Sequence, residues 1–103
     1  MPTPAEIARA VGLSFPAERR AKVLERLRTG YPAGRERCRV QAAILVLAGG
    51  DFNDLRRLVD AANQDYRDLL SWAEHPTESG GGTKRQMRER YQKLGLPVPD
   101  ELT

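Results

Sequence analysis

The side chains that could perform acid–base chemistry in this sequence are few. His75 is the only histidine among the 103 residues. A histidine beside a carboxylate can act as a general base, and Asp68 and Glu74 lie close to His75 in the sequence. Pro76 follows directly, however, and a histidine before a helix-ending proline is typical of a capping or surface residue. We therefore predict no catalytic residue and no enzyme activity.

Cys38 is the only cysteine, which excludes an internal disulfide and a cysteine-rich zinc site. It lies between Arg37 and Arg39, and nearby cations can lower the pKa of a thiol. The surrounding segment is apolar, which favours a small buried side chain over a reactive one.

Four aspartates, Asp51, Asp54, Asp65 and Asp68, resemble a set of metal ligands at first sight. On one continuous helix Asp51 and Asp65 would lie about four turns apart, roughly 20 Å, which is too far to share an ion. Helix capping explains the same residues without a metal. We predict neither a metal site nor a cofactor.

The charge alternates in sign along the chain, although the net charge is only +3. Residues 1–50 carry nine basic and four acidic side chains, residues 51–83 three and seven, and residues 84–103 five and three. Such a chain is no uniform polycation, and solvated helix faces explain most of the charge. Composition otherwise suits one globular domain, with 40% hydrophobic and 30% charged residues.

Capping residues, prolines and glycines divide the chain into helical segments. Thr3, Pro4 and Glu6 match a capping box with proline in the first turn. Residues 38–48 carry apolar side chains around more than one side, which predicts a central buried helix. The class we expect is all-α, a small single-domain bundle of about five helices. The first predicted helix spans residues 4–12 and ends at Gly12, and the second begins within residues 14–18 and ends at Gly30. The other three predicted helices span residues 35–48, 52–75 and 84–94.

The segment 52–75 has the most regular pattern. Its apolar residues are spaced alternately three and four apart, as one face of a helix requires. The pattern Asp51–Leu55 recurs at Asp65–Leu69, so a second cap at Asp65 would divide the segment into two helices. The lack of glycine and proline favours one long, bent helix. The apolar seam is Phe52, Leu55, Val59, Ala62, Tyr66, Leu69 and Ala73.

The predicted organisation is a helical domain at 1–76, a glycine-rich flexible linker at 77–83, and a basic helix with a proline-containing tail at 84–103. The last helix could contact nucleic-acid phosphates without sequence specificity. Alternatively, Met87, Tyr91 and Leu94 could dock it on the domain. The candidate nucleic-acid contacts are Lys84, Arg85, Arg88, Arg90 and Lys93.

Three groups of residues form a combined pattern: Gln41–Leu45, Gly50-Asp51, and the run Asp65-Tyr66-Arg67-Asp68 followed by Trp72-Ala73-Glu74. This pattern resembles that of a set of short bacterial proteins of uncharacterised function. The resemblance covers about residues 37–76 and implies no activity, ligand or cofactor. It does mark the run and Trp72, an amphipathic aromatic at the edge of the seam, as the first positions to test. The candidate partner surface is Asp65, Tyr66, Arg67, Asp68, Trp72 and His75.

The first residues lack the pattern of a signal peptide, and the longest apolar run, 42–48, is too short to span a membrane. We therefore expect a cytoplasmic protein without a membrane partner. Without paired catalytic groups, the leading hypothesis is a non-enzymatic module that binds an unidentified protein or associates with itself. The alternative is weak, salt-sensitive nucleic-acid binding through the basic C-terminal helix.

Overall fold

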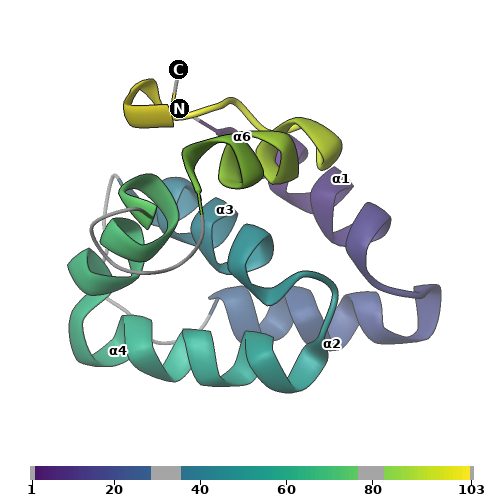
Figure 1. The fold of residues 1–103 in the computed structure, drawn as a ribbon. Helices are drawn as coiled ribbons and strands as arrows, with labels where there is room; N and C mark the ends of the chain where they lie inside the picture. Colours follow the sequence, from purple (N-terminus) through teal and green to yellow (C-terminus); the bar gives the residue numbers. More distant parts are fainter. Residues whose placement is uncertain (1, 29–35, 77–82, 103) are drawn as a thin grey trace.

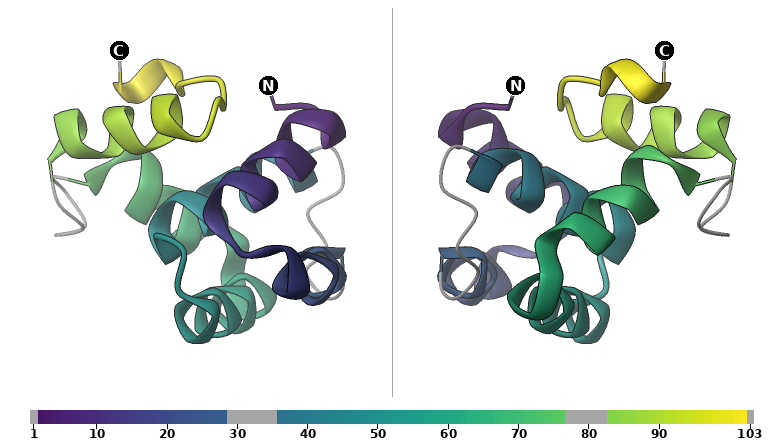
Figure 2. Two further views of the ribbon diagram at one scale, coloured as in Figure 1. Left: turned by 90° about the vertical axis from the view of Figure 1, so that its right-hand side faces the viewer. Right: turned by 90° about the vertical axis from the view of Figure 1, so that its left-hand side faces the viewer.

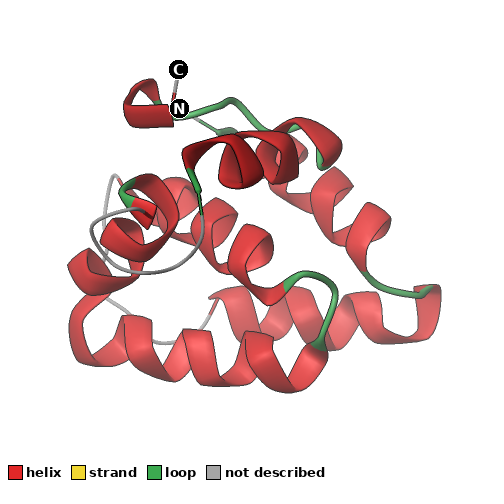
Figure 3. Cartoon of the chain, in the orientation of Figure 1, coloured by secondary structure: helices red, strands yellow, loops and turns green. Residues whose placement is uncertain are grey.

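The computed structural model describes residues 2–28, 36–76 and 83–102. These residues form α-helices with short connections between α1 and α2 and between α3 and α4, and contain no strand (Figures 1 and 3). The all-α class is therefore confirmed, as is the predicted number of about five helices within these described ranges. The helices are α1 (Pro4–Ser14), α2 (Ala17–Arg28), α3 (Arg37–Ala48), α4 (Phe52–Glu74) and α6 (Lys84–Lys93), followed by the 3-10 helix η2 (Asp100–Leu102).

Most helix boundaries form as local capping chemistry dictates. Thr3 and Glu6 make the reciprocal hydrogen bonds of a capping box at the start of α1. Thr83 and Gln86 make the same pair at the start of α6, so Thr83, predicted as linker, belongs to the helix cap. The remainder of the predicted linker, 77–82, and the predicted helix end at Gly30 lie outside the described residues.

The first helix does not end at Gly12, as the sequence predicted, but continues to Ser14. Arg20 of α2 explains the extension. Its guanidinium donates hydrogen bonds to the carbonyl oxygens of Gly12, at 3.0 Å, and Phe15, at 3.3 Å. The Phe15 backbone N–H also bonds the Val11 carbonyl at 3.0 Å. These bonds satisfy the last turn, and the adjacent Phe15 side chain is buried in the core.

Helix α3 is the centre of the molecule. Helices α1, α4 and α6 pack against it, and α1 and the second half of α4 lie on opposite sides of it (Figure 2). The prediction of a central helix buried on more than one side is confirmed. The side chains buried along it are Val40, Gln41, Ala42, Ala43, Ile44, Leu45, Val46 and Ala48.

A bidentate ion pair joins α3 to the end of α4. The Nε of Arg39 donates to Oε2 of Glu74 at 2.8 Å, and Nη2 donates to Oε1 of the same carboxylate. The Glu74 side chain is only 2% exposed, whereas Arg39 is 33% exposed. The hydrogen bond to Glu74 raises the pKa of Arg39 above its ordinary value. A carboxylate this deeply buried depends on a bidentate partner to offset its lost hydration.

Helix α4 is interrupted at Asp65, which corrects the preference for one continuous helix. The backbone of Asp65 is extended, with φ −159° and ψ 104°. Its Oδ1 accepts hydrogen bonds from the backbone N–H of Arg67 at 3.0 Å and from the Arg67 Nε at 3.1 Å. Asp65 therefore caps the second half of the helix, and the helix axis turns at this residue without glycine or proline.

Helix α6 and the tail pack on the body of the protein. Met87 and Tyr91 of α6 are buried, as are Leu96 and Leu102 beyond it. The helix contacts α3 and α4, and η2 contacts α6. The predicted apolar stripe of the last helix thus faces the core, although its third member, Leu94, is only half-buried.

Replacing Arg39 with methionine should show how much the buried pair contributes to stability. The variant Arg39→Met leaves the Glu74 carboxylate buried without a cationic partner. We expect a loss of about 2–4 kcal/mol in the free energy of unfolding, somewhat below the value for fully buried pairs because Arg39 is partly hydrated. Urea denaturation followed by circular dichroism measures the loss.

The matched control is Arg57→Met, which breaks the surface ion pair of Arg57 with Asp54, where the arginine side chain is 79% exposed. That change should cost less than ~1 kcal/mol. Equal losses in both variants would show that the Arg39 pair contributes no more than a surface contact.

The cap at Asp65 predicts a pH-dependent difference between the protein and Asp65→Ala. The hydrogen bonds from the side chain and backbone of Arg67 hold the pKa of Asp65 below its ordinary value. A lowered carboxyl pKa stabilises the fold above the unfolded-state value and loses that effect as the pH falls through the folded-state value. We expect Asp65→Ala to lower the thermal unfolding midpoint at pH 7, and the difference from the unmodified protein to shrink towards pH 3.

Candidate interaction groove

Four residues of the candidate partner surface have roles in folding. Asp65 caps the second half of α4, and Arg67 pairs with it. Tyr66 is half-buried and packs against the core. His75 is the C-terminal cap residue of α4, and its backbone N–H bonds the Ser71 carbonyl at 2.8 Å. This part of the Asp-Tyr-Arg-Asp run therefore positions the second half of α4.

The other two members, Asp68 and Trp72, are exposed on that second half. The Trp72 side chain is 37% exposed, and it lies one helical turn after Asp68. Arg67 is exposed as well, and Asp65, Tyr66 and His75 are half-buried, so none of the six residues is buried and the partner surface stays a prediction. Cys38 is a half-buried free thiol that packs against the core, in keeping with a small apolar side chain more than with a reactive one.

The predicted nucleic-acid contacts on α6 also fall into two groups, those that bond to groups of the protein and those that are exposed. Arg85 pairs with Glu89 at 3.3 Å, and Arg88 donates to the Leu102 carbonyl at 3.4 Å. Arg90 donates through Nη1 to the Val46 carbonyl of α3 at 3.2 Å. Lys84 and Lys93 are exposed at opposite ends of the helix. The basic helix is held against the core by its apolar side; two of its five cations, Arg88 and Arg90, bond to other parts of the protein, and a third, Arg85, pairs within the helix.

A groove lies where the C-terminal ends of α1 and α3 meet α6. Its volume is about 310 Å³. Leu13 and Ser14 line it from α1, and Leu45 and Val46 from α3. The turn residues Gly49 and Gly50, together with residues of α6 and its C-terminal end, complete the lining. We call this groove the interaction groove. The residues contributed from the α6 side are Arg90, Lys93 and Leu94.

The interaction groove combines apolar surface with positive charge. Leu13 is 61% exposed, which is more than any other large apolar side chain in the part of the chain that the structure describes. Arg90 and Lys93 stand beside it, and none of the lining residues is acidic. Arg90 uses one N–H for Val46, and a guanidinium has five, so donors remain for a ligand.

This groove was not predicted from the sequence. Leu13 lies just beyond the expected end of the first helix at Gly12. Arg90 and Lys93 were predicted as contacts, but for phosphates rather than for a groove with an apolar wall. The only signal in the sequence was a leucine before a serine at a helix end, which is too common to be informative.

Comparison with known proteins adds no relative: the chain matches no protein-family model, no curated protein and no solved structure. Within the described ranges no group of three or more histidine, cysteine or acidic side chains is arranged to hold a metal ion. None of the described helices is long and apolar enough to cross a membrane.

The shape of the interaction groove depends on Gly50, which predicts a contrast with its neighbour Gly49. Gly50 has φ 86°, and a Cβ placed there would lie 3.1 Å from the Ser14 carbonyl oxygen. Gly49 has φ 58°, and a Cβ there would meet no atom within 4 Å. We expect Gly49→Ala to cost about 1 kcal/mol of stability from backbone strain alone.

Gly50→Ala should cost more than Gly49→Ala, because the strain is joined by the contact with Ser14. Urea denaturation of both variants measures the difference. If the two variants lose the same free energy of unfolding, the end of α1 moves away from the added methyl group at no cost, and the groove is not rigid.

Proposed function

We propose that this protein is a non-enzymatic interaction module that binds a segment of a partner protein in the interaction groove. The observation that carries the proposal is the exposure of Leu13 beside two cations. An isolated exposed leucine is ordinary on a protein surface. A leucine at the mouth of a groove with a basic rim and no acidic lining residue is a binding surface with defined chemistry.

The partner segment we propose carries a large apolar side chain next to carboxylates. The apolar side chain packs on Leu13 and Leu94, the lining leucines that are exposed or half-buried. The carboxylates pair with Arg90 and Lys93, and such pairs fix the orientation of the segment and its rate of association more than its affinity. The volume of the groove suits one or two side chains, so the interface is small and the binding weak and reversible.

Several features favour this function over nucleic-acid binding. Three of the five cations of α6 bond to the protein itself. An apolar wall beside a cation also has no counterpart in phosphate recognition, which rests on many simultaneous positive contacts. We place the function in the cytoplasm, where a free thiol such as Cys38 is stable.

The test uses a fluorescein-labelled peptide with one leucine flanked by aspartate and glutamate, and a second peptide in which lysines replace the acids. Fluorescence anisotropy measures binding at low and moderate salt. We expect the acidic peptide to bind and the basic one not to bind. Amide shifts in two-dimensional NMR should be centred on Leu13, Val46 and Lys93.

Two charge reversals on the same helix provide matched variants. Lys93→Glu should weaken binding of the acidic peptide about tenfold or more, because it replaces an attraction with a repulsion. Lys84→Glu makes the same change at the far end of α6 and should leave the affinity unchanged. Leu13→Ala should weaken binding at little cost in stability, since most of the side chain is already exposed.

Three outcomes would contradict the proposal. The first is equal weakening by the two lysine variants, which indicates non-specific attraction. The second is tighter binding of a single-stranded oligonucleotide that Lys93→Glu abolishes, which indicates a nucleic-acid surface. The third is a dimer in light scattering that occupies the groove, which indicates self-association; Trp72→Ala would then show whether the tryptophan is the occupying side chain.

A further inference from the structure

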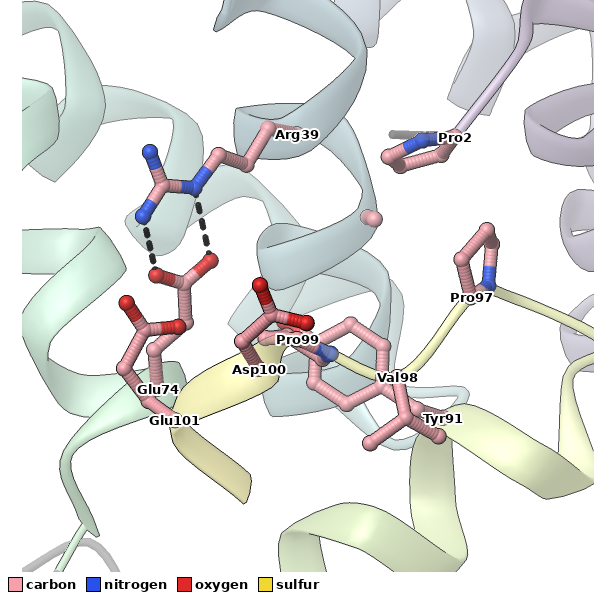
Figure 4. A pocket seen from close by; sticks show the side chains of 10 residues that line it. Pro2, Arg39, Glu74, Tyr91, Pro97, Val98, Pro99, Asp100 and Glu101 are labelled. Atoms are coloured by element: carbon pink, nitrogen blue, oxygen red, sulfur yellow. Dashed lines mark hydrogen bonds and ion pairs between the residues drawn. The ribbon is translucent and has the colours of Figure 1, made fainter. Parts of the chain in front are cut away.

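A second pocket, of about 310 Å³, lies between α3, the end of α4, α6 and the C-terminal segment (Figure 4). We call it the tyrosine pocket. Part of its wall is apolar and consists of Pro2, Pro97, Val98 and Pro99. Proline rings have fixed backbone φ angles, so this wall is stiff. The polar side of the pocket contains the Arg39–Glu74 ion pair, with Glu101 of η2 beside it.

The Tyr91 side chain, which lines this pocket, has a hydroxyl without a partner. The residue is 1% exposed, and its hydroxyl makes no hydrogen bond with any described residue. Burial raises the pKa of Tyr91 well above its ordinary value, and Glu74 and Glu101 act in the same direction. The hydroxyl is therefore neutral at physiological pH and lies within electrostatic range of the acidic side of the pocket. A buried hydroxyl without a partner carries a free-energy penalty that a ligand can remove.

The charges around the tyrosine pocket favour a cation. The single arginine is already neutralised, because Arg39 holds Glu74 in a bidentate pair and also bonds Glu36 at 3.2 Å. The carboxylate of Glu101 is additional, and the residue is exposed at the rim. Glu101 also contributes to the raised pKa of Arg39, which places its charge close to the ion pair. The pocket therefore has an excess of negative charge on one side and prolines on the other.

We propose that the tyrosine pocket binds a small organic cation, a primary ammonium group on a short aliphatic chain. The ammonium pairs with the Glu101 carboxylate and donates a hydrogen bond to the Tyr91 hydroxyl oxygen. The aliphatic chain packs on the wall formed by Pro2, Pro97, Val98 and Pro99. Three N–H donors on one ammonium suit a site whose polar groups are carboxylate and hydroxyl oxygens.

This site is separate from the interaction groove and opposite to it in charge. The groove is lined by the ends of α1 and α3, whereas the tyrosine pocket is lined by Arg39, near the start of α3, and by the C-terminal segment. The two proposals are tested with probes of opposite charge, so either can fail without the other.

The experiment titrates the full chain with butylammonium chloride, and in parallel with 1-butanol and sodium butyrate. These probes share a four-carbon chain and differ in charge. Two-dimensional NMR follows the amides of Ala42, Tyr91 and Glu101. We expect saturable shifts at these amides with butylammonium in the millimolar range, and no saturation with the alcohol or the carboxylate.

Two substitutions separate the contributions of charge and hydroxyl. Glu101→Gln removes the carboxylate at an exposed position and should weaken butylammonium binding about threefold to tenfold, the effect of one charged hydrogen bond. Tyr91→Phe removes only the hydroxyl and should weaken binding about threefold while leaving the fold intact or more stable, because the lost group has no partner. Glu89→Gln, the same charge change on α6 outside the pocket, is the control.

The proposal is overturned if butyrate saturates these amides and butylammonium does not, since Arg39 would then be binding an anion. It is equally overturned if Glu89→Gln weakens binding as much as Glu101→Gln, since the cation would then respond only to overall charge. Should Tyr91→Phe fail to fold, the comparison of Glu101→Gln with Glu89→Gln decides the question by itself.

Discussion

Helix α3 lacks a polar face along most of its length, and every other part of the structure follows from the need to cover it. A helix that is apolar on several sides is stable in water only when neighbours pack on each of them. Helices α1, α4 and α6 do so, and α2 joins through the buried hydrogen bond from Gln41 to the Leu27 carbonyl at 2.9 Å. The kink at Asp65 serves the same end, because it turns the second half of α4 along α3 and brings Glu74 to Arg39.

Arginine side chains join the helices around this core. Arg9, Arg20, Arg37, Arg88 and Arg90 each donate to a backbone carbonyl at or near the end of another segment. Carbonyls in the last turn of a helix lack partners within the helix, and a long cationic donor can reach them from a neighbour. These arginines keep their charge, but each contact directs one or more N–H donors towards a carbonyl of the protein itself.

The two proposed sites share one origin. Both form where α6 and its tail meet the rest of the protein. The interaction groove takes Arg90 and Lys93 from α6, and the tyrosine pocket takes Tyr91 from the same helix and Glu101 from the segment after it. Adjacent residues of one helix thus line different sites, because successive side chains of an α-helix are about 100° apart, and docking of α6 creates both a basic apolar groove and an acidic pocket. A helix detached from the core would form neither.

The sequence by itself determined the helical class, the caps at Thr3 and Asp51, and the buried character of 40–48, because each depends on residues within one or two turns of each other. It also contained the repeat that placed a second cap at Asp65, but only burial of both halves of α4 decided that the cap prevails over the continuous helix. The pairing of Arg39 with Glu74 spans 35 residues, and no local pattern distinguishes that carboxylate from the exposed acids around it. The groove at Leu13 and the unpartnered hydroxyl of Tyr91 likewise depend on segments distant in sequence, and so only the tertiary structure could reveal them.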